Sequence, residues 1–198
     1  ACKKLDEIIK KYFPNLKENY DTIVSPFFGG GSFEFYIQSN YQLEIIANDK
    51  FKPLYNFWET CKSNSKGLCD RLEEERQKPV NKEDFTRMRD DIMDEKNDLE
   101  QSIMYFIINR CSFSGATLSG GFSSEASEKR FTLSSIERVR QLDLCGHLPI
   151  PPNLPTTRRP KFEIYNMDFR QFISENRSGE KNLLFLDPPY YLEGGSRL

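Results

Sequence analysis

One stretch near the carboxyl end restricts the possible folds more than any other. Residues 183–186 are four consecutive apolar residues, Leu-Leu-Phe-Leu, and Asp187, Pro188, Pro189 and Tyr190 follow them. Such a run is typical of a fully buried strand in a parallel sheet, and the prolines must end it because proline donates no ladder hydrogen bond. The stretch therefore predicts a strand that delivers a carboxylate and an aromatic ring to the carboxyl edge of an open α/β sheet, where such sheets bind ligands.

This tetrapeptide suits methyl transfer to the exocyclic amine of a flat base. The amine is a weak nucleophile because its lone pair is delocalised into the ring. The Asp187 carboxylate and the Pro188 carbonyl can accept both amine hydrogens and direct the lone pair at a sulfonium methyl, which is catalysis by positioning and electrostatics. Tyr190 would stack on the base, a contact worth about 1 to 3 kcal/mol. Ordinary strands also end in an acid and prolines, so the tetrapeptide alone does not decide the function.

A glycine-rich turn follows an earlier predicted strand over residues 21–25. The turn reads Pro-Phe-Phe-Gly-Gly-Gly-Ser (residues 26–32), and Ser32 is placed to cap the helix that follows. Glycines allow the backbone to approach a ligand closely. The turn lacks the Gly-Lys-Ser/Thr end of a P-loop, and Glu34 stands at the third glycine position of a dinucleotide fingerprint. A nucleoside-like ligand without a pyrophosphate therefore fits the turn better.

Further elements continue this α/β pattern. Residues 43–47 predict a strand that Asn48 and Asp49 end, and an acid about 20 residues beyond a glycine turn is suited to bind ribose hydroxyls. The alternative, that Asp49 caps the helix predicted after it, stays open. Residues 161–165 predict another strand, and an amphipathic helix is predicted over residues 3–13.

The middle of the chain departs from this pattern. It predicts a loop at residues 63–67, a long helix over 82–108, a Gly/Ser-rich loop up to residue 127, a helix capped by Thr132 or Ser134, and an extended linker over 149–160 with its five prolines. We therefore predict an α/β domain made of residues 1–62 and 159–198, and an inserted, mainly helical region at residues 63–158.

Composition excludes several classes of function. The five cysteines are odd in number and include no C-x-x-C pair, and His147 is the only histidine. A disulfide framework, a zinc site and Ser-His-Asp chemistry are therefore disfavoured. No apolar run reaches membrane-spanning length and no signal-peptide pattern is present, which predicts a cytoplasmic protein.

Residues 70–100 carry a net charge of -5 and residues 129–161 a net charge of +5, so a segment suited to phosphate contact lies within a nearly neutral chain.

The glycine turn, the inserted region and Asp-Pro-Pro-Tyr, in this order, resemble the Dam-like family of S-adenosylmethionine-dependent DNA adenine-N6 methyltransferases over almost the whole chain. The resemblance implies a Rossmann-like sheet, S-adenosylmethionine as methyl donor, double-stranded DNA with a flipped adenine as substrate, no metal and no membrane, and we expect a monomer. It implies catalytic roles for Asp187, Pro188, Pro189 and Tyr190. The cofactor-binding residues that it implies are Lys3, Phe27, Gly29, Gly31, Ser32, Asp49, Asp168 and Phe169. Those implied to bind DNA are Asn109, Arg110, Ser114, Gly115, Lys129 and Arg130.

The chain departs from the family at both ends. Only Ala1 and Cys2 precede Lys3, and the family's sheet has further strands beyond the one that carries Asp187, so we expect an incomplete sheet and a fragment of a longer enzyme. Two alternatives stay open. One is a methyltransferase that acts on RNA or on a protein glutamine amide, and the other is a truncated, non-catalytic DNA-binding or cofactor-binding remnant.

Overall fold

The computed structural model describes residues 2–142, 144, 160–176, 179 and 181–189. Contacts divide the chain into two compact units. The first comprises residues 1–50 and 145–190, and the second comprises residues 51–144 and 191–198. The boundary expected at residues 62 and 63 falls inside a helix, and the linker expected over residues 149–160 lies outside the described residues.

The first unit contains a parallel sheet, as the sequence predicts. Its strands are β1 (Thr22–Ser25), β2 (Glu44–Asn48), β3 (Phe162–Tyr165) and β4 (Asn182–Leu184). In the described residues they form one sheet in the order β3-β2-β1-β4, and every neighbouring pair is parallel. This is the α/β, Rossmann-like fold that was expected, with β1 in the interior of the sheet.

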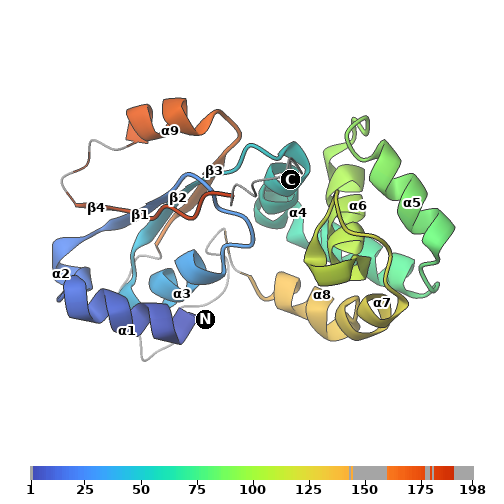
Figure 1. Cartoon of the computed structure of the whole chain (residues 1–198), viewed down its shortest axis with the longest axis horizontal. Helices are drawn as coiled ribbons and strands as arrows, with labels where there is room; N and C mark the ends of the chain where they lie inside the picture. Colours follow the sequence, from blue (N-terminus) through green and yellow to red (C-terminus); the bar gives the residue numbers. More distant parts are fainter. Residues whose placement is uncertain (1, 143, 145–159, 177–178, 180, 190–198) are drawn as a thin grey trace, which may run out of the picture. The chain divides into compact units, whose positions relative to one another are not determined.

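Helices cover both faces of this sheet. Figure 1 shows α1 (Cys2–Tyr12) and α3 (Ser32–Tyr41) on one side and α9 (Phe169–Asn176) on the other, and the short α2 (Leu16–Asn19) leads into β1. Ile23 of β1, Ile45 of β2, Ile37 of α3 and Phe172 of α9 are fully buried in the resulting core. A buried carboxylate joins α1 to α3, because Asp6 accepts hydrogen bonds from the hydroxyls of Tyr36 and Tyr41.

The apolar run at residues 183–186 is less buried than its sequence predicts. The strand covers only Asn182–Leu184, and Leu184 and Leu186 are 41% and 53% exposed. A continuous apolar run is buried only where both faces of a strand are covered and it has neighbours on both sides. In the described part of the sheet, β4 lies at the edge and pairs with β1 alone.

The second unit is mainly helical, in agreement with the sequence. It contains α4 (Lys52–Arg76), α5 (Lys82–Asp91), α6 (Asp98–Cys111), the 3-10 helix η1 (Phe113–Gly115), α7 (Ser124–Arg130) and α8 (Leu133–Arg140). Buried side chains of α4, α6 and α8, among them Leu68, Ile107 and Ile136, form its core.

Three local predictions in this region were wrong. The loop expected at residues 63–67 is part of α4, which has only a kink at Asn64. The long helix expected over residues 82–108 is two helices, because the Asn97 side chain accepts hydrogen bonds from the amides of Leu99 and Glu100 and so caps a new helix, α6. The loop expected up to residue 127 contains the start of α7. The cap at Thr132 is confirmed, since its side chain accepts from the amide of Ser135.

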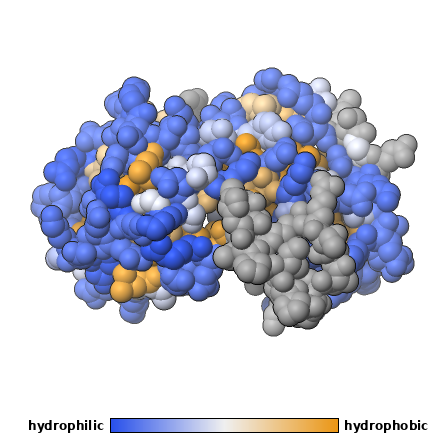
Figure 2. Space-filling model, turned by 180° about the vertical axis from the view of Figure 1, so that it is seen from behind, coloured by the Kyte–Doolittle hydropathy of each residue, from blue (hydrophilic) through white to orange (hydrophobic). Residues whose placement is uncertain are grey.

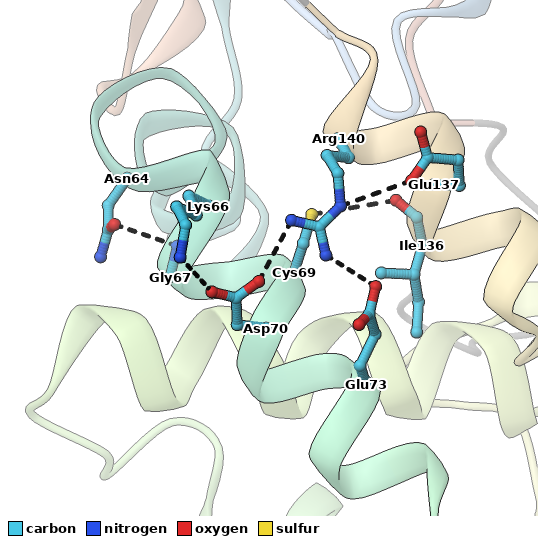
Figure 3. A network of polar contacts seen from close by, with 9 residues as sticks. All are labelled: Asn64, Lys66, Gly67, Cys69, Asp70, Glu73, Ile136, Glu137 and Arg140. Carbon is cyan, nitrogen blue, oxygen red and sulfur yellow. Dashed lines mark hydrogen bonds and ion pairs between the residues drawn. The ribbon is translucent and has the colours of Figure 1, made fainter.

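Ion pairs connect α8 to α4 within this unit. Arg140 on α8 contacts Asp70 and Glu73 of α4 at 3.1 and 2.6 Å and Glu137 of its own helix at 3.4 Å (Figure 3). Lys66 pairs with Asp70 at 2.7 Å, so the five charged side chains form one network. Arg140 belongs to the basic segment of the sequence and its partners on α4 to the acidic one. Part of the basic charge is therefore neutralised inside the unit.

The surface drawn in Figure 2 is mostly hydrophilic, and hydrophobic residues lie in small groups between the polar ones. Within the described ranges, no helix combines the length and the apolar character that crossing a membrane requires. Cys61, Cys69 and Cys111 are buried free thiols.

Candidate cofactor and catalytic site

The strand order places the two sequence motifs next to each other. From β1 the chain proceeds outward to β2 and β3, and then returns to the opposite side of β1 to form β4. Val24 is in register with Leu184, and the amide of Phe185 donates a 2.9 Å hydrogen bond to the Val24 carbonyl. The glycine turn after β1 and Asp187 after β4 thus lie at the topological switch point of the sheet, where open α/β sheets bind their ligands.

A cavity of about 420 Å³ lies at this switch point. Its lining comprises residues 27–34 of the glycine turn and helix α3, together with Leu5, Phe185 and Asp187. Ligand pockets for small molecules commonly enclose about 300 to 1,000 Å³. The cavity therefore has the size of a cofactor site, and both motifs contribute to it.

The glycine turn depends on two glycines with positive φ. Gly29 has φ +52° and Gly31 has φ +62°. A Cβ on Gly31 would lie 2.4 Å from the ring of Phe28, so a larger residue does not fit there, whereas a Cβ on Gly29 would meet open space. Gly31 is the N-cap of α3, and Ser32 is its first residue rather than the cap that the sequence predicted.

Asp49 binds the backbone of this turn. Its Oδ2 accepts a 3.0 Å hydrogen bond from the amide of Gly29, which holds the half-buried carboxylate beside the cavity-lining turn. The alternative role as a helix cap is not supported, because α4 begins after Phe51, which stands at the N-cap position. The carboxylate therefore lies at the carboxyl end of the second strand, next to the turn that lines the cavity.

Asn48, which the sequence suggested only as the end of a strand, joins three loops. Its side chain is 1% exposed. Its Nδ2 donates to the carbonyls of Pro26 and Met167, both at 3.2 Å, and its Oδ1 accepts from the amide of Met167 at 3.0 Å. Its own carbonyl accepts from the amide of Phe28 at 3.0 Å. The segments that follow β1, β2 and β3 are thus fixed to one another by one buried amide.

Phe169 packs against the turn, and neither Phe169 nor Asp168 is part of the cavity lining. The rings of Phe27 and Phe169 pack with centroids 5.1 Å apart, which places Phe169 next to a residue that lines the cavity. Asp168 accepts a 2.9 Å hydrogen bond from the amide of Arg170 at the start of α9 and forms long ion pairs with Lys50 and Arg170. Lys3 is on α1, but its side chain lies outside the description, as does Tyr190.

Sequence reasoning missed a buried acid in the cavity, Glu34. Its side chain is 3% exposed and its Oε1 accepts a 2.6 Å hydrogen bond from the hydroxyl of Ser25 at the end of β1. Burial raises the pKa of Glu34, the bond from Ser25 and the amides of Glu34 and Phe33 oppose that rise, and the charge of Asp187 adds to it. Glu34 is in the first turn of α3, where a P-loop would bind phosphate, so a carboxylate already occupies that position. The available signal was an acid between two phenylalanines directly after the turn.

The predicted DNA-binding residues lie in the second unit, where several gather around the end of α6. Asn109 donates a 2.9 Å hydrogen bond to the carbonyl of Gly115, and the Arg130 guanidinium bonds the carbonyl of Ser112. Gly115 and the exposed Ser114 have positive φ, so the chain turns sharply here. Lys129, in contrast, pairs with Glu125 on its own helix at 2.6 Å.

Arg110 has an unusual environment in this group. Its guanidinium lies over the ring of Phe106 at 5.1 Å, and its buried Nε has no hydrogen-bond partner in the described structure. Burial lowers the pKa of Arg110, and the nearby charges of Arg138 and Arg130 lower it further. Three arginines thus concentrate positive charge near the end of α6, which is the electrostatic requirement for contact with a phosphate backbone.

The model of the D12 class N6 adenine-specific DNA methyltransferase family matches residues 3–196 of the chain. No curated protein matches the chain. The described residues contain no group of three or more histidine, cysteine, aspartate or glutamate side chains arranged to hold a metal ion.

Proposed function

Because the chain belongs to the D12 class N6 adenine-specific DNA methyltransferases, we propose that it transfers a methyl group from S-adenosylmethionine to N6 of adenine in double-stranded DNA, with the target base flipped out of the duplex. The observation that carries this proposal is that the glycine turn and Asp187 line one cavity. A cofactor-binding corner and an amine-binding corner must be adjacent for a methyl group to pass between them.

The residues around the cavity fit the proposed cofactor. S-adenosylmethionine supplies an electrophilic methyl group on a sulfonium. The backbone of the turn, with Phe27, Gly29, Gly31 and Ser32, would hold its methionine part. Asp49, already oriented by the Gly29 amide, would accept the ribose hydroxyls. Phe169, packed against Phe27, and Asp168 would lie beside the adenine ring.

Catalysis would depend on the position of the target amine. The carboxylate of Asp187 and the carbonyl of Pro188 would accept the two N6 hydrogens, and Pro189 would stiffen this corner. Their hydrogen bonds favour a more tetrahedral nitrogen whose lone pair attacks the methyl carbon. The N–C bond forms as the C–S bond breaks, and one N6 proton then leaves to solvent. Asp187 and Pro188 are exposed, so a base can reach them. Tyr190 would stack on that base.

The second unit would supply the contact with DNA. Arg110, Arg130 and Asn109 lie around one sharp turn with Ser114 and Gly115, and their positive charge suits a phosphate backbone. Lys129 is assigned a smaller role, since its ammonium pairs with Glu125.

The test is transfer of labelled methyl groups to separate duplex DNA, RNA and protein substrates, followed by digestion and identification of the modified unit. We expect N6-methyladenine from DNA, and its loss in Asp187→Ala. N6-methyladenine from RNA only, or methylglutamine from protein, would instead support the alternative substrates. Binding of S-adenosylmethionine without methylation of any substrate would indicate a non-catalytic remnant.

A further inference from the structure

The cavity at the switch point contains two carboxyl groups, and only one has a role so far. Glu34 and Asp187 are the ionisable groups among the described residues that line it, and the others are glycine, serine, leucine and phenylalanine. Asp187 is exposed, whereas Glu34 is 3% exposed. Neither the sequence motifs nor the proposed chemistry at N6 uses Glu34.

The position of the Glu34 carboxyl is well defined. It accepts a 2.6 Å hydrogen bond from Ser25, which is fully buried at the end of β1, and the amides of Phe33 and Glu34 stabilise its charged form. These partners belong to the interior strand β1 and to the first turn of α3, which lines the cavity. The carboxyl group is therefore held against the cavity by rigid elements rather than by a loop.

A negative charge at this position costs free energy in the absence of a ligand. Burial disfavours the ionised carboxylate, and the Asp187 charge repels it. In the described structure the contacts of Glu34 are with Ser25 and the backbone, and no lysine or arginine forms an ion pair with it. A cation in the cavity would offset both costs at once, because it would attract the two carboxylates.

We propose that Glu34 makes this cavity selective for a positively charged methyl donor over the product that remains after transfer. The inference rests on the proposed function, in which the donor is a sulfonium and the product a neutral thioether. The two molecules otherwise have nearly the same shape, so the turn and the aromatic residues cannot distinguish them strongly. A fixed carboxylate attracts the sulfonium and has no such attraction for the thioether, so it favours donor binding and product release.

Calorimetric titration of the 198-residue chain without DNA tests this selectivity. The ligands are S-adenosylmethionine, S-adenosylhomocysteine and sinefungin, in which a carbon bearing an ammonium group replaces the methylated sulfonium. In Glu34→Gln we expect affinity for the two cations to fall about tenfold and affinity for the thioether to change less than about threefold. Glutamine has nearly the same shape as glutamate and can still accept the Ser25 hydrogen bond. Circular dichroism would verify that the variant is folded.

Two control variants separate charge from structure. Glu18→Gln removes an equal charge from an exposed position on α2, and it should leave all three affinities unchanged. Ser25→Ala removes the hydrogen bond but keeps the carboxylate, and it should keep the ratio of donor to product affinity within about threefold.

The outcomes distinguish this inference from the proposed function. If Glu34→Gln lowers the affinity for all three ligands equally, or lowers the affinity for none of them, Glu34 does not discriminate charge. Binding of the donor by the unaltered chain would still leave the proposed function intact. Failure of the unaltered chain to bind any of the three would contradict the proposed function itself, and the selectivity with it.

Discussion

The rings of Phe33 and Phe185 pack against each other with their centroids 4.6 Å apart. Phe33 follows the glycine turn and Phe185 is two residues before Asp187, so this contact joins the two motifs that line the cavity. Residues separated by about three quarters of the chain thus form one wall of the site.

Asp187→Ala should abolish methylation while cofactor binding largely survives. The carboxylate is assigned to the N6 amine, and loss of one preorganised electrostatic partner commonly costs about 100-fold or more in rate. Initial rates of methyl transfer to duplex DNA would measure the loss, and calorimetry should show a change in cofactor affinity below about tenfold. Asp21→Ala is a suitable control, since Asp21 is exposed just ahead of the amino end of β1. Retained activity in Asp187→Ala would remove this residue from its assigned role.

Asp49→Ala should weaken cofactor binding by about tenfold or more, because it removes both the proposed ribose acceptor and the partner of the Gly29 amide. Asp49→Asn keeps an acceptor for that amide, so it should fall between the alanine variant and the unaltered chain. Calorimetric titration with S-adenosylmethionine gives both values. Unchanged affinity in the alanine variant would mean that the ribose is bound elsewhere.

Asn48→Asp should destabilise the first unit by about 2 to 3 kcal/mol. The substitution replaces a buried donor to the carbonyls of Pro26 and Met167 by a carboxylate that repels them. The free energy of unfolding in urea measures the effect. Asn40→Asp is the matched control, since its side chain is exposed and donates a hydrogen bond to the Tyr36 carbonyl of its own helix. Equal stability of the two variants would contradict the structural role of Asn48.

Arg130→Ala should weaken binding to duplex DNA more than Lys129→Ala does. Arg130 lies with Arg110 and Arg138 near the end of α6, whereas the adjacent Lys129 pairs with Glu125. Fluorescence anisotropy at several salt concentrations would show a salt slope about one unit smaller for Arg130→Ala if a phosphate contact is lost. If both variants reduce affinity equally, the charge of the segment matters but the arrangement at the end of α6 does not.

As the pH rises, the free energy of unfolding of Glu34→Gln should increase relative to that of the unaltered chain. Burial, with the charge of Asp187, raises the pKa of Glu34 in the folded state above its unfolded value. As the pH rises, the unfolded chain therefore releases the proton first, and the stability present below the unfolded pKa is lost as the pH rises through the folded pKa. Glutamine removes this loss. Urea unfolding between pH 5 and 8 measures this difference in the free energy of unfolding.

Much of the fold could be predicted from local pattern. The strands near residues 21–25, 43–47 and 161–165 were found within a residue or two, since apolar runs followed by glycine or polar residues restrict the backbone locally. The helices of the second unit were predicted less well. Asn97 begins a new helix inside a stretch whose composition favours one continuous helix, because a single side-chain cap outweighs the small differences in helix propensity.

The candidate site, too, could be predicted only in part from the sequence. The glycine turn and Asp187 were recognisable because their chemistry follows from residue type and order. The burial of Glu34 against Ser25, the bond from Gly29 to Asp49 and the three-loop role of Asn48 were not, since each joins residues from different elements.

By itself the sequence determined which segments become strands and which chemical groups follow them. Only the tertiary structure decided that β4 lies beside β1, which brings Asp187 to the glycine turn and leaves Leu184 and Leu186 exposed. The physical reason is that a strand and its end depend on backbone geometry and hydrogen-bond donors a few residues away. The order of strands depends instead on how distant apolar faces pack, which no local pattern specifies.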